Sequence, residues 1–207
     1  MKIKQHFISY DPKQASSQLD FVYCPICSTK LVKKEIDATL RNYCAECRYI
    51  QYINPLPGVS VLIEKDGCLL IGKRSQDSTA SGKWCLPCGF VEHHENYLEA
   101  AHREVFEETG LEIKINALVN VSSNHINPDL HTIVTVLTAE VISGTPEAGD
   151  DLVALSWLEK NDAFPVLAFE ADEFIIKNFF ENSLIEIPID PRFRLRLEKE
   201  NKNEMGI

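Results

Sequence analysis

Residues 89–111, GFVEHHENYLEAAHREVFEETGL, are the segment that most constrains how this chain can fold. Asn96 with Glu99 three residues later matches a capping box, and Gly110 is a typical helix stop. The segment therefore predicts one helix over residues 97–109.

Three glutamates of this helix, Glu104, Glu107 and Glu108, stand at i, i+3 and i+4 and so share one face, and Glu95 lies in the loop before them. Like charges at these spacings repel by about 0.2–0.5 kcal/mol per pair unless a cation or Arg103 offsets them. Carboxylates without Cys or His suit a hard ion such as Mg²⁺ or Mn²⁺. The alternative is an acidic helix face that only contacts solvent.

The full spacing, G-x5-E-x7-R-E-U-x-E-E-x-G-U with U a bulky aliphatic residue, resembles the Nudix box. That box is the signature of Nudix hydrolases, which cleave nucleoside diphosphates linked to another moiety. Gly89 and Gly110 occupy its fixed loop positions. The resemblance implies an α/β/α sandwich with a mixed sheet, metal ligation by the three glutamates, and a catalytic role for them and Arg103.

The family's box arginine pairs with carboxylates, and Glu99 and Glu107 both lie within one turn of Arg103. Glu95 is expected to ligate less directly than the helix glutamates. Cys88 and His94 depart from the family pattern, because glycines are frequent at both positions. Neither departure removes a ligand.

A second motif lies upstream, where Cys24 and Cys27 are followed after sixteen residues by Cys44 and Cys47. Two C-x2-C pairs at this spacing are typical of a zinc ribbon, in which four thiolates complete a closed tetrahedral shell. A closed shell has no open position for substrate, so we expect a structural Zn²⁺. Disulfide bonds are the alternative, and the absence of a secretory signal at the start of the chain disfavours them.

The remaining cysteines, Cys68, Cys85 and Cys88, are expected to pack as small apolar residues, although Cys85 and Cys88 form a third C-x2-C beside the acidic segment. Histidines 93, 94, 102, 125 and 131 lack the spacing of a ligand set. Among them, His125 and His131 are candidates for contacts with substrate.

Composition narrows the class of protein. The 207 residues are 44% hydrophobic and 25% charged, as in ordinary globular proteins, and no apolar run is long enough to span a bilayer. We therefore expect a cytoplasmic protein with no membrane partner. A net charge of −10 disfavours a nucleic-acid polymer as partner but permits a small nucleotide substrate, since a bound metal supplies local positive charge.

Four regions are expected: an N-terminal arm at 1–20, the zinc ribbon at 21–53, the Nudix domain at 54–185 and a C-terminal tail at 186–207. The elements expected within the third region are a breaker-rich hinge at 54–58, a β-hairpin at 59–74, β-strands at 113–124, 131–143 and 152–158, and a closing helix at 170–182.

In the tail, Arg192, Arg194 and Arg196 alternate with apolar residues. Alternation favours an edge strand or a contact within a homodimer over a nucleic-acid arm.

A ribbon followed by a Nudix domain resembles NADH pyrophosphatases and a related group that acts on ADP-ribose or FAD. The sequences YINP at 52–55 and LAF at 167–169 resemble the second group. Residues 121–129, VSSNHINPD, lack the SQPWPFP-type element of NADH pyrophosphatases. ADP-ribose or FAD is therefore the expected substrate, with AMP as one product, and NADH or another dinucleotide is the alternative.

The implied mechanism is attack of water on phosphorus, and Asp150 and Asp151 are the candidates for general base or additional metal ligand. Phe90, Tyr97 or residues of the ribbon could stack on adenine. Two further readings stay open: a non-catalytic Nudix-fold sensor of nucleotides, and an enzyme for RNA caps or oxidised nucleotides. Sensors often lose box glutamates, and this chain retains all of them.

Overall fold

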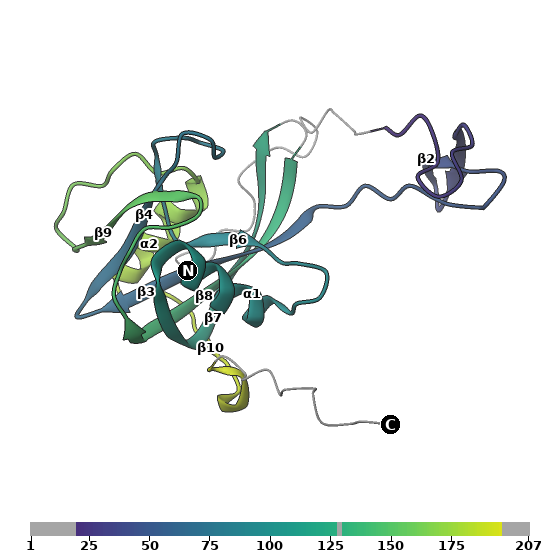
Figure 1. Cartoon of the computed structure of the whole chain (residues 1–207). Coiled ribbons are helices and arrows are strands. Elements are labelled where there is room, and N and C mark those ends of the chain that lie inside the picture. Colours follow the sequence, from purple (N-terminus) through teal and green to yellow (C-terminus); the bar gives the residue numbers. More distant parts are fainter. Residues whose placement is uncertain (1–19, 128–129, 196–207) are drawn as a thin grey trace, which may run out of the picture.

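The computed structural model describes residues 20–127 and 130–195, without the side chains of 125–127. Its main feature is an eight-stranded mixed sheet (Figure 1) with the order β10-β7-β8-β3-β4-β5, in which β6 pairs with β3 and β9 with β4. Strands β3 and β8 are parallel, and the other pairs are antiparallel. The strands of this sheet are β3 (Leu56–Lys65), β4 (Cys68–Arg74), β5 (Trp84–Cys85), β6 (Cys88–Phe90), β7 (Leu111–Asn127), β8 (Leu130–Gly144), β9 (Leu152–Leu158) and β10 (Ile187–Pro188).

Two helices, α1 (Tyr97–Thr109) and α2 (Glu170–Phe180), cover opposite faces of this sheet. Both faces of β3 are covered because successive side chains of a strand point to opposite faces. Val61 and its neighbours two residues away pack with α1, whereas Leu62 packs with α2. Ala101 of α1 and Ile176 of α2 are fully buried in the two resulting cores. The α/β/α sandwich with a mixed sheet is therefore confirmed.

Helix α1 has the bounds that the sequence predicts. The Asn96 side chain accepts hydrogen bonds from the backbone N–H groups of Leu98 and Glu99, and the Glu99 carboxylate accepts from the Asn96 N–H. Gly110 ends the helix with φ 69°, in the left-handed region that favours glycine.

The other expected elements are present, β9 with the expected bounds and the rest with shifted bounds, and the turn residues 128–129 lie outside the described part. Strand β3 begins at Leu56, inside the expected hinge, and Pro57 is tolerated there because it is close to the start of the strand. Helix α2 ends at Phe180, two residues early.

The predicted edge strand in the tail is wrong as far as the chain is described. Residues Pro191–Phe193 form a 3₁₀ helix, because the Asp190 carboxylate caps the N–H of Arg192 and Pro191 favours a helical first position. The strand of this region is instead β10, which pairs with β7. Arg196 and the rest of the tail lie outside the described residues, as does most of the expected N-terminal arm.

The cysteine-rich segment forms a separate two-stranded sheet of β1 (Val32–Ile36) and β2 (Thr39–Tyr43). In Figure 1 it stands apart from the large sheet and is joined to it by the chain that leads into β3. Among the described residues, no helix has the length and apolar character needed to cross a membrane.

Candidate functional site

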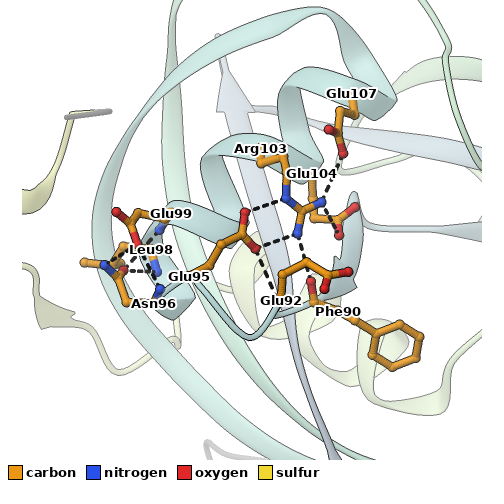
Figure 2. Close-up of polar contacts among 9 residues, drawn as sticks. All are labelled: Phe90, Glu92, Glu95, Asn96, Leu98, Glu99, Arg103, Glu104 and Glu107. Atoms are coloured by element: carbon orange, nitrogen blue, oxygen red, sulfur yellow. Dashed lines mark hydrogen bonds and ion pairs between the residues drawn. The ribbon is translucent and has the colours of Figure 1, made fainter. Parts of the chain in front are cut away.

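Arg103 is the centre of the polar network on α1 (Figure 2). Its Nε and Nη2 donate to the two oxygens of Glu95 at 2.6 and 2.8 Å, and its Nη1 donates to Glu104 at 2.8 Å and Glu107 at 3.0 Å. Nη2 also donates to the carbonyl of Phe90 at 3.0 Å. One guanidinium thus links the loop before the helix to two of the three helix glutamates.

The loop residue Glu95 has a clearer role in the structure than in the sequence. Its bidentate pair with Arg103 is the strongest geometry available to an arginine, and the guanidinium lowers the pKa of the Glu95 carboxyl. Glu99, which the sequence places within reach of Arg103, instead completes the capping box of Asn96. The pairing of Arg103 with Glu107 is as expected.

Gly89 leaves open the space that the Glu104 carboxylate occupies. A Cβ at position 89 would lie 2.0 Å from Cδ of Glu104, so only glycine leaves room for that carboxylate. Glu104 itself is buried, and burial raises the pKa of its carboxyl. The first glycine and the first helix glutamate of the motif, fifteen residues apart in sequence, therefore meet at one point in space.

Glu108 is 1% exposed, and its Oε2 accepts a hydrogen bond from the backbone N–H of Cys88 at 2.8 Å. Burial raises the pKa of this carboxyl well above its usual range. A carboxylate at such a depth is costly unless a positive charge offsets it. A bound cation would supply that charge.

The donor set of Glu104, Glu107 and Glu108 fits a hard divalent ion, since it contains only carboxylate oxygens. Two of these glutamates meet at a single nitrogen of Arg103. Within the described residues, however, the four ribbon cysteines are the only group of three or more His, Cys, Asp or Glu residues whose ligand atoms all lie within 4.8 Å of one another. This wider spacing is compatible with Mg²⁺, which retains several waters and needs one or two carboxylates.

A cavity of about 510 Å³ opens in front of the glutamates. Phe90 and Asp150 line it, whereas Tyr97 is absent from its lining. Asp151 also lines it, but Oδ2 of Asp151 accepts from Arg74 at 3.2 Å. The structure thus separates the two aspartates, because only Asp151 forms an ion pair with Arg74.

Sequence reasoning missed two buried charged residues of this cavity, Arg74 at the end of β4 and Asp172 in the first turn of α2. Arg74 is 7% exposed, and its guanidinium lies 5.7 Å from the ring of Phe169. Oδ2 of Asp172 accepts from the N–H of Leu86 at 3.2 Å, and burial raises the pKa of Asp172 to about 7. The sequence signal that could have identified both residues is their position next to apolar residues of an expected strand or helix.

The LAF segment brings Phe169 to the cavity. Backbone N–H of Ala168 donates to the carbonyl of Trp84 at 2.7 Å, and Trp84 donates to Val166 at 3.0 Å, so this segment runs beside β5. The position of Phe169 is therefore decided by pairing with a strand more than eighty residues earlier.

The other cysteines and histidines take mostly structural positions. Cys85 is fully buried in the core, Cys88 lines the cavity, and Cys68 is partly buried. No histidine with a described side chain lines the cavity. The side chain of His125 lies outside the described residues, so the expectation for it stays a prediction.

The four ribbon cysteines converge as a tetrahedral zinc site requires. Cys24 Sγ lies 3.5 Å from Cys47 Sγ, and Cys27 Sγ lies 3.4 Å from Cys44 Sγ. Four sulfurs about 2.3 Å from one ion would be separated by about 3.8 Å. The set thus fits Zn²⁺ closely.

The two halves of this cluster have the same backbone geometry. Ser28 N–H donates to the carbonyl of Cys24 at 2.9 Å, and Arg48 N–H donates to that of Cys44 at 3.0 Å. Ser28 and Arg48 both have left-handed backbones, with φ 60° and 64°. Two equivalent knuckles, each ending in such a turn, are what the repeated C-x2-C motif predicts.

Comparisons with known proteins agree with this fold and site. The family model of the NUDIX domain matches residues 54–180. An ADP-ribose pyrophosphatase of Methanocaldococcus jannaschii is 39% identical over 133 residues, covering 64% of this chain and 77% of the relative. A solved NUDIX hydrolase of Nitrosomonas europaea has a TM-score of 0.67 and 25% identity, covering 78% of this chain and 92% of that one.

A further group of relatives is named NAD-capped RNA hydrolase NudC. The protein of Chromobacterium violaceum is 29% identical over 147 residues, and that of Mannheimia succiniciproducens is 30% identical over 95 residues. This chain spans 52% and 36% of their lengths. With the family match over more than half of the chain, these similarities lead to one assignment: the chain belongs to the Nudix family and is a Nudix hydrolase.

Proposed function

We propose that this Nudix hydrolase cleaves the diphosphate linkage of ADP-ribose or FAD, depends on Mg²⁺ or Mn²⁺, and releases AMP. The observation that carries the proposal is the arrangement of Arg103 with Glu95, Glu104 and Glu107 at a cavity that also contains the buried Glu108. Such an arrangement concentrates hard oxygen ligands beside space for a small substrate.

The metal would be held by Glu104, Glu107 and Glu108, where it would neutralise the diphosphate and lower the pKa of a bound water. Arg103 orients Glu104 and Glu107 through its Nη1, and Glu95 holds the guanidinium in place. Glu95 is therefore a positioning residue in this proposal and a lesser candidate as ligand.

Asp150 is the proposed base, whose carboxylate would accept a proton from the attacking water. It lines the cavity, and its charge helps raise the pKa of Glu104. Its backbone φ of 47° lies in the left-handed region, which aspartate adopts more readily than most residues other than glycine. Asp151, held by Arg74, instead helps to position that arginine for the substrate's phosphates.

The substrate assignment draws its support from the similarity to the M. jannaschii ADP-ribose pyrophosphatase and from the LAF segment, which brings Phe169 to the cavity. A second candidate, NADH or an NAD-linked substrate, is supported by the similarity to the NudC proteins. Both candidates are nucleoside diphosphate derivatives, so the same site would serve either.

The deciding experiment is an assay of ADP-ribose, FAD, NADH, NAD, diadenosine polyphosphates and nucleoside triphosphates, each with Mg²⁺ and with Mn²⁺. We expect ADP-ribose or FAD to have the highest kcat/KM and to give AMP. A tenfold preference for NADH or for a triphosphate would contradict the substrate assignment. Binding of ADP-ribose without turnover of any compound would indicate a nucleotide sensor.

Two variants control this assay. Glu108→Gln should lose turnover, because it removes a proposed ligand. Glu186→Gln, an exposed residue outside the cavity, should turn over like the wild type. Equal activity of both variants would argue against catalysis at this site.

For the ribbon, we propose a structural Zn²⁺ held by Cys24, Cys27, Cys44 and Cys47. The close approach of the four sulfurs supports this role, and a closed set of four ligands leaves no position for a substrate. One equivalent of zinc in the purified protein is the expected result of metal analysis.

A further inference from the structure

One face of the sheet forms the floor of the cavity. The paired residues on it share a face because direct partners in a sheet point the same way. Ser60 of β3 is paired with Val136 of β8, and Asn124 of β7 is paired with Thr132 of β8. The cavity-lining residues of this face, here called the floor, are Gly58, Ser60, Ser122, Asn124, Thr132, Val134 and Val136.

The floor is open because α2 covers only the neighbouring part of the same face. Leu62, two residues beyond Ser60, packs with Ile175 and Ile176 of that helix. Val136 contributes to that core and also lines the cavity, so the boundary between covered and open sheet passes beside it.

Charge is distributed unevenly around the cavity. The floor contains no ionisable side chain, whereas the charged lining residues come from α1, α2, the loops and the end of β4, where Arg74 lies. Phosphates require cations or a metal, and the lining arginines are Arg103 of α1 and Arg74 of β4, while the proposed metal ligands lie on α1. An uncharged, partly apolar part of a ligand suits the floor.

Two hydroxyls of the floor lack partners. Ser60 is 4% exposed and Thr132 is 1% exposed, and neither hydroxyl has a hydrogen-bond partner among the described residues. A buried hydroxyl left unpaired costs about 1–3 kcal/mol, so a ligand that bonds both would gain affinity. Ser122, in contrast, donates to Asn124 at 2.9 Å.

The register sets the spacing of these two hydroxyls. Thr132 is paired with Leu56, four residues before Ser60, which corresponds to roughly 13 Å along the strands at ~3.3 Å per residue. Ser60 is also paired with Cys88, whose N–H binds Glu108, so Ser60 marks the end nearest the glutamates.

An aromatic residue stands between the two ends. Phe90 is paired with Gly58, midway between Leu56 and Ser60 in the register, and lines the cavity with 44% of its surface exposed. A base can stack on such a ring, and Gly58 has no side chain to obstruct it.

We propose that the floor binds the nucleoside half of the substrate, with Ser60 bonding the sugar beside the diphosphate, Phe90 stacking on the base and Thr132 bonding its outer edge. Ser60 and Thr132 are then specificity residues of this chain. The proposal rests on the proposed function in one respect, since it takes the substrate to be a nucleoside diphosphate derivative.

The test measures the Kd of AMP by calorimetry with Mg²⁺ present, in Ser60→Ala, Thr132→Val and the control Thr138→Val. Thr138 is on the same strand as Thr132 and has an equally unpartnered buried hydroxyl, but it is not part of the cavity lining. All three variants should keep or gain thermal stability, since each loses an unpaired polar group.

We expect Ser60→Ala and Thr132→Val each to weaken AMP binding by about 5- to 10-fold, the worth of one hydrogen bond, and Thr138→Val to leave it within twofold. Thr132→Val should leave the Kd of ribose 5-phosphate, which has no base, unchanged. Weaker ribose 5-phosphate binding with unchanged AMP binding would overturn the assignment of the floor to the nucleoside.

The failure of this proposal is distinguishable from failure of the proposed function. If ADP-ribose and FAD are not hydrolysed but AMP binding follows the expected pattern, the nucleoside site stands without that activity. If ADP-ribose is hydrolysed and the Ser60 and Thr132 variants bind AMP like the wild type, the assignment of the floor is wrong.

Discussion

Gly89→Ala tests whether the position of the Glu104 carboxylate governs catalysis. The added Cβ would lie 2.0 Å from Cδ and 2.1 and 2.2 Å from the two oxygens of Glu104. Carbon atoms need about 3.5 Å, so the carboxylate must move by roughly 1.5 Å. Misplacement of about 1 Å at a reacting centre can cost about 100-fold in rate, which corresponds to about 2.7 kcal/mol.

Stability should respond much less than turnover. The group that must move is the end of a side chain, so folding can accommodate it at a cost of about 1–2 kcal/mol, including the weakened contact with Arg103. We therefore expect ADP-ribose turnover with Mg²⁺ to fall at least about 100-fold while the protein stays folded at the assay temperature.

Gly67→Ala is the matched control. Unlike Gly89, Gly67 has no steric neighbour within 4 Å, but its φ of 82° makes alanine strained, so stability should fall without loss of turnover. A double-mutant cycle with Glu104→Gln adds a second check, because Gly89→Ala should cost little further activity once that ligand is gone. Turnover of Gly89→Ala within threefold of the wild type would refute the reasoning.

Three further perturbations have distinct expected outcomes. Glu108→Gln should reduce turnover at least about 100-fold. The same change should stabilise the metal-free protein in thermal melts at pH 8, because burial raises the pKa of Glu108 and penalises its charged form. Normal turnover of this variant would exclude Glu108 as a metal ligand. Replacing Cys24 and Cys27 by Ser should release one zinc and unfold the ribbon, as metal analysis and proteolysis would show, while retained zinc would contradict the four-thiolate site. Asp172→Asn should stabilise the protein by at most about 4 kcal/mol at pH 8 and little near pH 4. Burial raises the pKa of Asp172 from 3.8 to about 7, so the stability that the protonated carboxyl contributes at low pH is lost as pH rises through 7. Denaturant melts should show this pH trend for Asp172→Asn and not for the control Glu170→Gln.

Local chemistry was predictable wherever neighbouring residues decide it. Asn96, Glu99 and Gly110 fix the two ends of α1 by hydrogen bonds within a few residues, and the predicted bounds of that helix are correct. The same capping box explains the error about Glu99, whose carboxylate is taken by Asn96 and so does not pair with Arg103.

In the C-terminal tail, the prediction from side-chain periodicity alone was wrong. Alternation of arginines with apolar residues predicts a strand from side-chain period alone, but Asp190 and Pro191 start a 3₁₀ helix that ends the pattern. The cap by Asp190 and the fixed φ of Pro191 there outweigh the side-chain periodicity, although the Arg194 carbonyl still accepts a hydrogen bond from Ile115 N–H of β7 at 2.9 Å.

The sequence by itself determined the glutamate face of α1, the paired cysteine knuckles and the family, because each depends on fixed spacing along a short stretch of chain. Only the tertiary structure decided that Arg74 meets Asp151 from 77 positions away, that Asp172 is buried in the cavity wall, and that Ser60 and Thr132 share one floor. Those contacts depend on strand register and on where α2 stops covering the sheet. Both are set by the packing of the whole core, which no local pattern encodes.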